Sequence, residues 1–217
     1  MKMQVKRLFY DIVNNLVPGI VALTALYVVH HHSEQCHQPI FELRELVLTL
    51  LPFEIIVLLF VAYFISHFLS SLTTLFFEGF LLRMSLLARF TRDSRILGPN
   101  LYKAFVEKFQ KTFGFEPGPK DFPACVIYVE AGQPAIYSSA VLFESFCGLA
   151  GNLTFILILY SLSEVVSWFI FGNLQSLQYV AIVIPITLVA FYHYLRLLRC
   201  YKLRILLGFI VSQDKNP

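Results

Sequence analysis

Four apolar stretches, each long enough to cross a lipid bilayer, dominate this sequence of 217 residues. The hydrocarbon core of a bilayer is about 30 Å thick, and a helix needs roughly 20 apolar residues to cross it. The stretches cover residues 12–29, 46–77, 146–171 and 177–195. Only 14% of all residues are charged, whereas a soluble domain carries about 25%. The sequence therefore predicts an all-α integral membrane protein with four transmembrane helices.

Lys and Arg residues lie in segments that a four-span chain places on one side of the membrane. They occur at the N-terminus, between the second and third spans and in the C-terminal tail, and Arg44 is the single exception among 17. Because Lys and Arg accumulate in cytoplasmic loops, we expect both termini in the cytoplasm. Three histidines, His30–His32, follow the first stretch where a cleavage site would have small residues. We therefore interpret that stretch as a span and not as a signal peptide.

The spans and the basic segments divide the chain into four parts. Residues 1–77 are expected to form an N-terminal transmembrane hairpin, and residues 146–195 a C-terminal one. Residues 78–145 form a cytoplasmic loop segment between them, and residues 196–217 a cytoplasmic tail. A segment of this length cannot hold a large independent core. We expect it to be small, mainly helical and folded against its own spans or a partner.

Local patterns predict the structure of this loop segment. Asn100 is expected to cap a helix that ends at Gly114. Aromatic residues recur on one face of this helix, at Tyr102, Phe105, Phe109 and Phe113. Residues 126–129 resemble a short strand, and a helix that begins near Ala135 is expected to run into the third span.

Three of the ionisable residues expected inside the spans are functional candidates, namely Glu54, His67 and Glu164. An ionisable group in hydrocarbon is costly and marks a functional candidate. Two interpretations remain open for Glu54 and Glu164. In an oligomer they would form a ring of carboxylates at a pore mouth, and otherwise they would reach the outer interface or bond to neighbouring polar groups. His67 lies among serines and threonines that favour helix packing and interhelical hydrogen bonds, with a water path as the alternative.

Basic residues of the loop segment are candidates for docking a soluble partner. They are Arg83, Arg89, Arg92 and Arg95. The alternative is a charge layer that faces anionic lipid headgroups. We expect no direct nucleic-acid binding, because no dense basic run with interleaved aromatic residues occurs.

The sequence predicts no enzyme, metal or cofactor. The common hydrolase, nucleotide-binding and metalloprotease motifs are absent. The loop that contains His30–His32, Glu34, Cys36 and His37 has the ligand types of a transition-metal site. Its close spacing favours an ordinary outer loop.

The segments Phe9-Tyr10-Asp11 and Leu16-Val17-Pro18-Gly19, followed by an apolar helix, resemble the start of many small bacterial four-span proteins of antiphage defence operons. The four spans, the loop segment and the chain length also resemble the membrane subunit of the Kiwa defence system. This resemblance implies a homo-oligomer in the bacterial inner (plasma) membrane that recruits a soluble DNA-binding partner. It assigns no site residues.

Two functions follow as hypotheses. The first is an oligomeric membrane sensor or scaffold that recruits and regulates a soluble cytoplasmic partner through the loop segment. The alternative is a channel-forming or membrane-disrupting effector whose pore is lined by Glu54 and Glu164.

Overall fold

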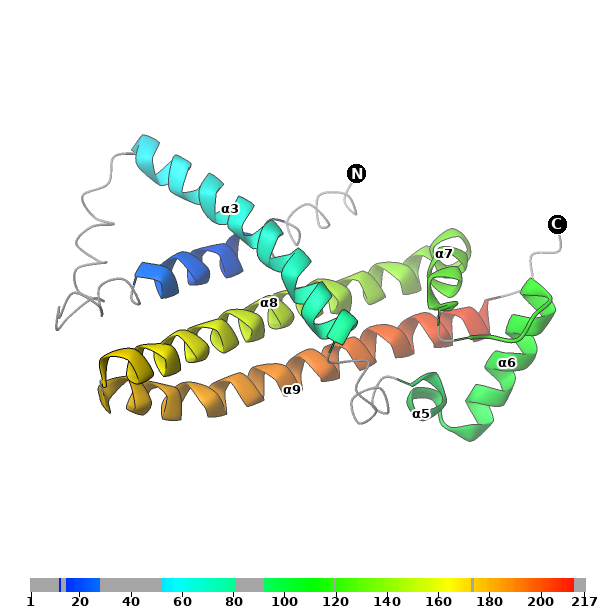
Figure 1. The fold of residues 1–217 in the computed structure, drawn as a ribbon. Coiled ribbons are helices and arrows are strands. Elements are labelled where there is room, and N and C mark those ends of the chain that lie inside the picture. The colour runs from blue at the N-terminus through cyan, green and yellow to red at the C-terminus, as the bar shows by residue number, and fades with distance from the viewer. Residues whose placement is uncertain are drawn as a thin grey trace. The chain divides into compact units, whose positions relative to one another are not determined.

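The computed structural model describes residues 12, 15–27, 52–80, 92–118, 120–172 and 174–212. These residues are almost all helical, and no strand occurs among them, which confirms the all-α prediction for this part of the chain. The elements are the helix Asn15–Tyr27, α3 (Pro52–Thr74), the π-helical η1 (Leu75–Phe80), α5 (Asp93–Leu97), α6 (Pro99–Phe113), α7 (Phe122–Gly132), α8 (Pro134–Phe171) and α9 (Leu174–Val211) (Figure 1).

Three helical stretches are long and apolar enough to cross a membrane, namely Pro52–Phe77, Pro134–Ile170 and Ser176–Val211. Many of their large apolar side chains lie at the surface, and Phe60 and Phe169 are 63% and 83% exposed. Because apolar surface of this extent is unfavourable in water, these helices indicate a membrane-spanning protein. The helix Asn15–Tyr27 is apolar but shorter. Since residues 28–51 lie outside the described ranges, a fourth span stays a prediction.

The helices form two compact units. The first unit contains residues 1–77 and 148–194, and the second contains residues 78–147 and 195–217. Each of the long helices α8 and α9 contributes residues to both units. The location of the second unit in the cytoplasm stays a prediction.

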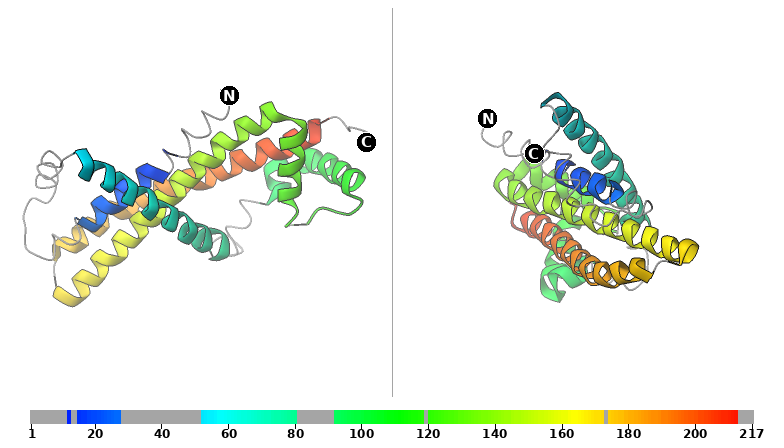
Figure 2. Two further views of the ribbon diagram at one scale, coloured as in Figure 1. Left: turned by 90° about the horizontal axis from the view of Figure 1, so that it is seen from above. Right: turned by 90° about the vertical axis from the view of Figure 1, so that its left-hand side faces the viewer.

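Close backbone approach organises the first unit. A Cβ atom added to Gly19 would lie 1.8 Å from the carbonyl oxygen of Ala62 on α3, so only glycine allows this crossing. A Cβ atom at Gly151 on α8 would lie 3.2 Å from the Tyr194 ring of α9 and 3.3 Å from the Thr73 methyl group of α3. In this unit α8 and α9 lie side by side, and α3 crosses them at an angle (Figures 1 and 2). The small residue Gly151 therefore allows α8 to approach both α3 and α9 closely.

An aromatic cluster forms the centre of the second unit. The ring centroid of Phe209 on α9 lies 5.9 Å from that of Phe105, 6.0 Å from that of Phe109 and 5.1 Å from that of Tyr128. Fully buried aliphatic side chains from α7 and α9 complete this core, among them Val129, Ile205 and Leu206. The segment after the second span therefore folds around the end of α9, within its own chain.

Helix α6 confirms most of the local prediction. Phe105 and Phe109 are buried, with exposed fractions of 2% and 0%. The helix ends at Gly114, whose φ of 81° is left-handed and whose N–H donates to the carbonyl of Gln110 over 2.8 Å. The prediction that Asn100 caps the helix is wrong. Gly98 occupies that position, because Pro99 fits the first helical position and places Asn100 inside the first turn.

The strand predicted for residues 126–129 is wrong. These residues belong to α7, in which Cys125 and Val129 lie one turn apart and are both fully buried. A short apolar run has the same composition in a buried strand and a buried helix, so tertiary packing decides between them. Residues 196–211, which we expected only as a tail, continue α9 as a helix.

Candidate functional site

Glu164 is the buried one of the two described carboxyl groups in the first unit. It lies on α8 and is 3% exposed. The Tyr160 hydroxyl, one turn earlier on the same helix, lies beside the Glu164 carboxyl. Glu54, in contrast, lies in the first turn of α3 and is exposed. Within one chain the two carboxyl groups therefore have different environments.

His67 lies on an exposed face of α3. Its ring meets the Tyr63 ring edge to face, with 4.6 Å between centroids. The opposite face of α3 is buried and carries Ser66 and Thr73. The hydroxyl oxygens of Ser66 and Thr73 have no hydrogen-bond partner among the described residues. Ser66 and Thr73 thus lie on the packed face of α3, and within this part of the chain they do not make the predicted interhelical hydrogen bonds.

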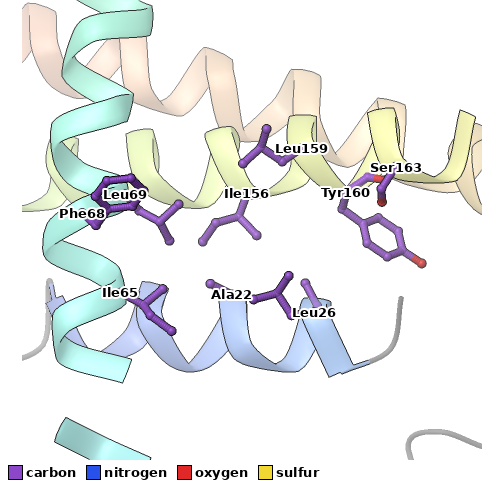
Figure 3. A pocket seen from close by; sticks show the side chains of 10 residues that line it. Ala22, Leu26, Ile65, Phe68, Leu69, Ile156, Leu159, Tyr160 and Ser163 are labelled. Atoms are coloured by element: carbon purple, nitrogen blue, oxygen red, sulfur yellow. The ribbon is translucent and has the colours of Figure 1, made fainter. Parts of the chain in front are cut away.

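An apolar cavity of about 410 Å³ lies within the first unit. Ala22 and Leu26 of the helix Asn15–Tyr27 face Ile156 and Leu159 of α8 across it (Figure 3). Side chains of α3 close one end, among them Ile65. This cavity was not predicted from the sequence. Small residues at three-residue spacing (Gly19, Ala22 and Ala25) were the available signal, because such a face allows close helix packing.

Two of the four predicted docking arginines, Arg92 and Arg95, lie within the described residues, and both are exposed. Arg83 and Arg89 lie outside them. Arg199 of α9 donates from Nη2 to the carbonyl oxygen of Arg95 over 3.5 Å. Two arginines that are distant in sequence therefore lie near each other at the surface of the second unit.

A partly buried ion pair lies beside these arginines. The Nζ atom of Lys202 is 3.8 Å from Oδ1 of Asp93, which is too long for a hydrogen bond. The same Nζ lies 5.2 Å from the centroid of the Phe122 ring. Burial raises the pKa of the Asp93 carboxyl above its usual value of 3.8, and the nearby Lys202 charge opposes part of this rise.

Lys108 has a structural role that the sequence analysis missed. Its Nζ donates to the carbonyl oxygens of Ile210, over 3.2 Å, and of Ser212. These carbonyls lie at the C-terminal end of α9, where helix oxygens lack partners within the helix. Lys108 thus caps α9 from α6.

Three cysteines are described, namely Cys125, Cys147 and Cys200, and none of them forms a disulfide with another described residue. Burial raises the pKa of the Cys125 thiol to about 12, and the nearby charges of Asp93 and Asp121 add to this rise. Among the described residues, no three His, Cys, Asp or Glu side chains are grouped as metal ligands. The histidine-rich loop that begins at His30 lies outside these ranges, so its interpretation as an ordinary loop stays a prediction.

Comparison with known proteins adds no relationship. No protein-family model, no curated protein and no solved structure matches this chain. The proposed function therefore depends on the site geometry and on the sequence patterns.

Proposed function

We propose that the chain is an oligomeric membrane sensor or scaffold that recruits and regulates a soluble cytoplasmic partner. In this proposal the first unit anchors the protein in the bacterial inner membrane, and the second unit presents the docking surface. The assignment to an antiphage defence system depends only on the resemblance described above, in the N-terminal segments and in the overall plan of spans, loop segment and chain length. The partner and the oligomer are likewise expectations from that resemblance.

The observation that supports the docking role is the exposed pair Arg95 and Arg199. The two residues come from α5 and α9, and the second unit has its own aromatic core that holds these elements together. Guanidinium groups bind carboxylates through two parallel hydrogen bonds, so neighbouring arginines on a rigid surface suit an acidic protein face. Because the Asp93 carboxylate is paired with Lys202, its negative charge does not fully cancel the positive charge of Arg95 and Arg199.

Charge reversal tests this proposal. The full chain would carry Arg92→Glu, Arg95→Glu and Arg199→Glu, and soluble proteins that co-purify with it from the native host would be quantified. We expect a soluble partner of the unmodified chain to be lost from the variant. Lys120→Glu is the control, because Lys120 is exposed in the same unit but lies in the loop between α6 and α7. Retention of the partner by the triple variant contradicts the docking surface.

The channel-forming alternative has less support from the first unit. Glu164 is 3% exposed and lies beside the Tyr160 hydroxyl, so it is not presented to a pore by a single chain. Ion flux through vesicles that contain the purified protein, abolished by Glu164→Gln, would favour the channel over the scaffold.

A further inference from the structure

We propose that the apolar cavity of the first unit binds one acyl chain of a membrane phospholipid. The cavity lies between the helix Asn15–Tyr27, α3 and α8, all within that unit. This inference is independent of the proposed function, because it uses no residue of the second unit.

The cavity exists because small side chains follow a close helix crossing. At Gly19 the backbone of the first helix touches the backbone of α3 at Ala62. One and two turns further along the same helix, Ala22 and Ala25 line the cavity. A large side chain at Ala22 would fill the space opposite Ile156 of α8 (Figure 3), and one at Ala25 would also reduce the cavity. Alanine leaves it open.

The lining excludes water and polar ligands. Among the described residues that line the cavity, only Tyr160 and Ser163 have a polar side-chain atom. The Ser163 hydroxyl donates to the carbonyl of Tyr160 over 2.7 Å, and the Tyr160 hydroxyl lies beside the Glu164 carboxyl. Both polar groups are thus engaged within α8. Because a buried water needs two to four polar partners, the chemistry of the cavity fits a hydrocarbon occupant.

The position of the cavity favours an acyl chain as that occupant. Three lining residues, Leu26, Phe68 and Leu159, are also exposed, by 61%, 67% and 44%, so the cavity opens to the surroundings of the helices. α3 and α8 are long and apolar enough to cross a membrane, so those surroundings are lipid tails. A volume of about 410 Å³ falls in the range of ligand sites, about 300–1,000 Å³. An empty apolar space of this size would lose the dispersion contacts of its lining atoms.

Photolabelling of the full chain tests this proposal. The protein would be reconstituted in vesicles of phosphatidylethanolamine and phosphatidylglycerol that contain a trace of phosphatidylethanolamine with a diazirine in its acyl chain. After irradiation, mass spectrometry locates the adducts. We expect several-fold more adducts on Ile65 and Ile156 than on Leu188, which is exposed on α9 and does not line the cavity.

Filling the cavity should remove this preference. With Ala22→Leu and Ala25→Leu together, labelling of Ile156 should fall to the level of Leu188. Ala181→Leu is the matched control, because Ala181 is exposed on α9 and does not line the cavity. In this control variant the labelling of Ile156 should not change. If the double variant loses helix content, Leu159→Trp fills the cavity from a position that is already exposed and should give the same loss.

Three results would overturn the proposal. Equal labelling of Ile156 and Leu188 in the unmodified chain would show that the cavity holds no lipid preferentially. Unchanged labelling in both filled variants would show that the adducts arise elsewhere. With a diazirine-bearing amino acid in place of Ile156, a crosslink between two copies of the chain would identify a second copy as the occupant.

Discussion

The Nζ atom of Lys108 on α6 donates to the carbonyl oxygen of Ile210 at the end of α9, over 3.2 Å. The two residues are 102 positions apart in the sequence. This bond, together with the aromatic contacts of Phe209, joins the loop segment and the C-terminal residues into one folded unit. A lysine beside the last carbonyls of a helix also interacts favourably with the helix dipole.

Lys108→Met should weaken the end of α9, because methionine keeps an apolar side chain but removes the donor. We expect a loss of about 1–2 kcal/mol in the stability of the second unit, the range of a hydrogen bond from a charged group. Amide hydrogen exchange of residues 208–212 should accelerate, and that measurement checks the prediction. Lys103→Met is the control, because Lys103 is 82% exposed and its 3.9 Å contact with Glu107 contributes little.

Phe209→Ala should destabilise the second unit by about 3–5 kcal/mol, the usual cost of removing a buried aromatic ring. Phe209 is fully buried and contacts rings from α6 and α7. Thermal unfolding in a mild detergent measures the effect. Phe169→Ala removes the same side chain from a position that is 83% exposed, and its unfolding temperature should change little. Equal effects of the two substitutions would contradict the assigned core.

Gly19→Ala should destabilise the first unit, because the added methyl group meets the backbone of Ala62 and neither backbone moves without cost. Overpacking of this kind costs about 1–3 kcal/mol or more. Gly148→Ala is the matched control on α8, because a Cβ atom there meets nothing within 4 Å. Alanine is also the better helix former, so the control should be neutral or stabilising by up to about 1 kcal/mol. A neutral Gly19→Ala variant would contradict the crossing.

The partly buried carboxyl group of Asp93 should make the second unit less stable as pH rises. The folded pKa of Asp93 is raised, so the folded state binds more protons than the unfolded state at a pH between the unfolded value of 3.8 and the raised value. Stability from this group is therefore present below pH 3.8 and lost as pH rises through the folded pKa. The free energy of unfolding should be measured across this pH range. In the Asp93→Asn variant, the fall in this free energy that Asp93 causes should be absent.

At neutral pH the same substitution, Asp93→Asn, should be neutral or stabilising, since it removes a partly buried charge. Lys202→Ala should instead destabilise by roughly 1–2 kcal/mol, less than for a fully buried pair, because it leaves the Asp93 carboxylate without its cation. Equal losses in both variants would show that burial is not the dominant influence on Asp93.

Cys125 should resist alkylation in the folded protein. The thiolate is the reactive form, and a pKa of about 12 leaves very little of it at neutral pH. Iodoacetamide followed by mass spectrometry should modify Cys200, which is half-buried, before Cys125. Reactivity of Cys125 should rise as pH approaches 12. Rapid modification at neutral pH, with the helix content intact, would contradict its burial.

The sequence predicted the features that depend on composition and on local periodicity. Long apolar runs form long apolar helices whatever their distant contacts are. The spacing of Phe105 and Phe109 places both residues on one face of a helix. The start of α6 was wrong by two residues because Pro99 takes the first helical position. These features can be predicted without knowing which distant residues contact each other.

The features that depend on contacts between distant residues were not predicted. Residues 126–129 are apolar in either a strand or a helix, and only their packing in the core of the second unit selects α7. The spacing of Ile205, Leu206 and Phe209 is helical and was a usable signal for the continuation of α9. The spacing of Gly19, Ala22 and Ala25 indicated a face for close packing, but not that Ala62 would be its contact, because that depends on how two helices cross.

The membrane topology of the second unit tests the central claim most directly. Alkaline phosphatase, which is active only after export, and a fluorescent protein that matures in the cytoplasm would each be inserted at Lys120, in the exposed loop after α6. Our account predicts a fluorescent, membrane-bound fusion and an inactive phosphatase fusion. An active phosphatase at Lys120, or recovery of the chain as a soluble monomer without detergent, would contradict it.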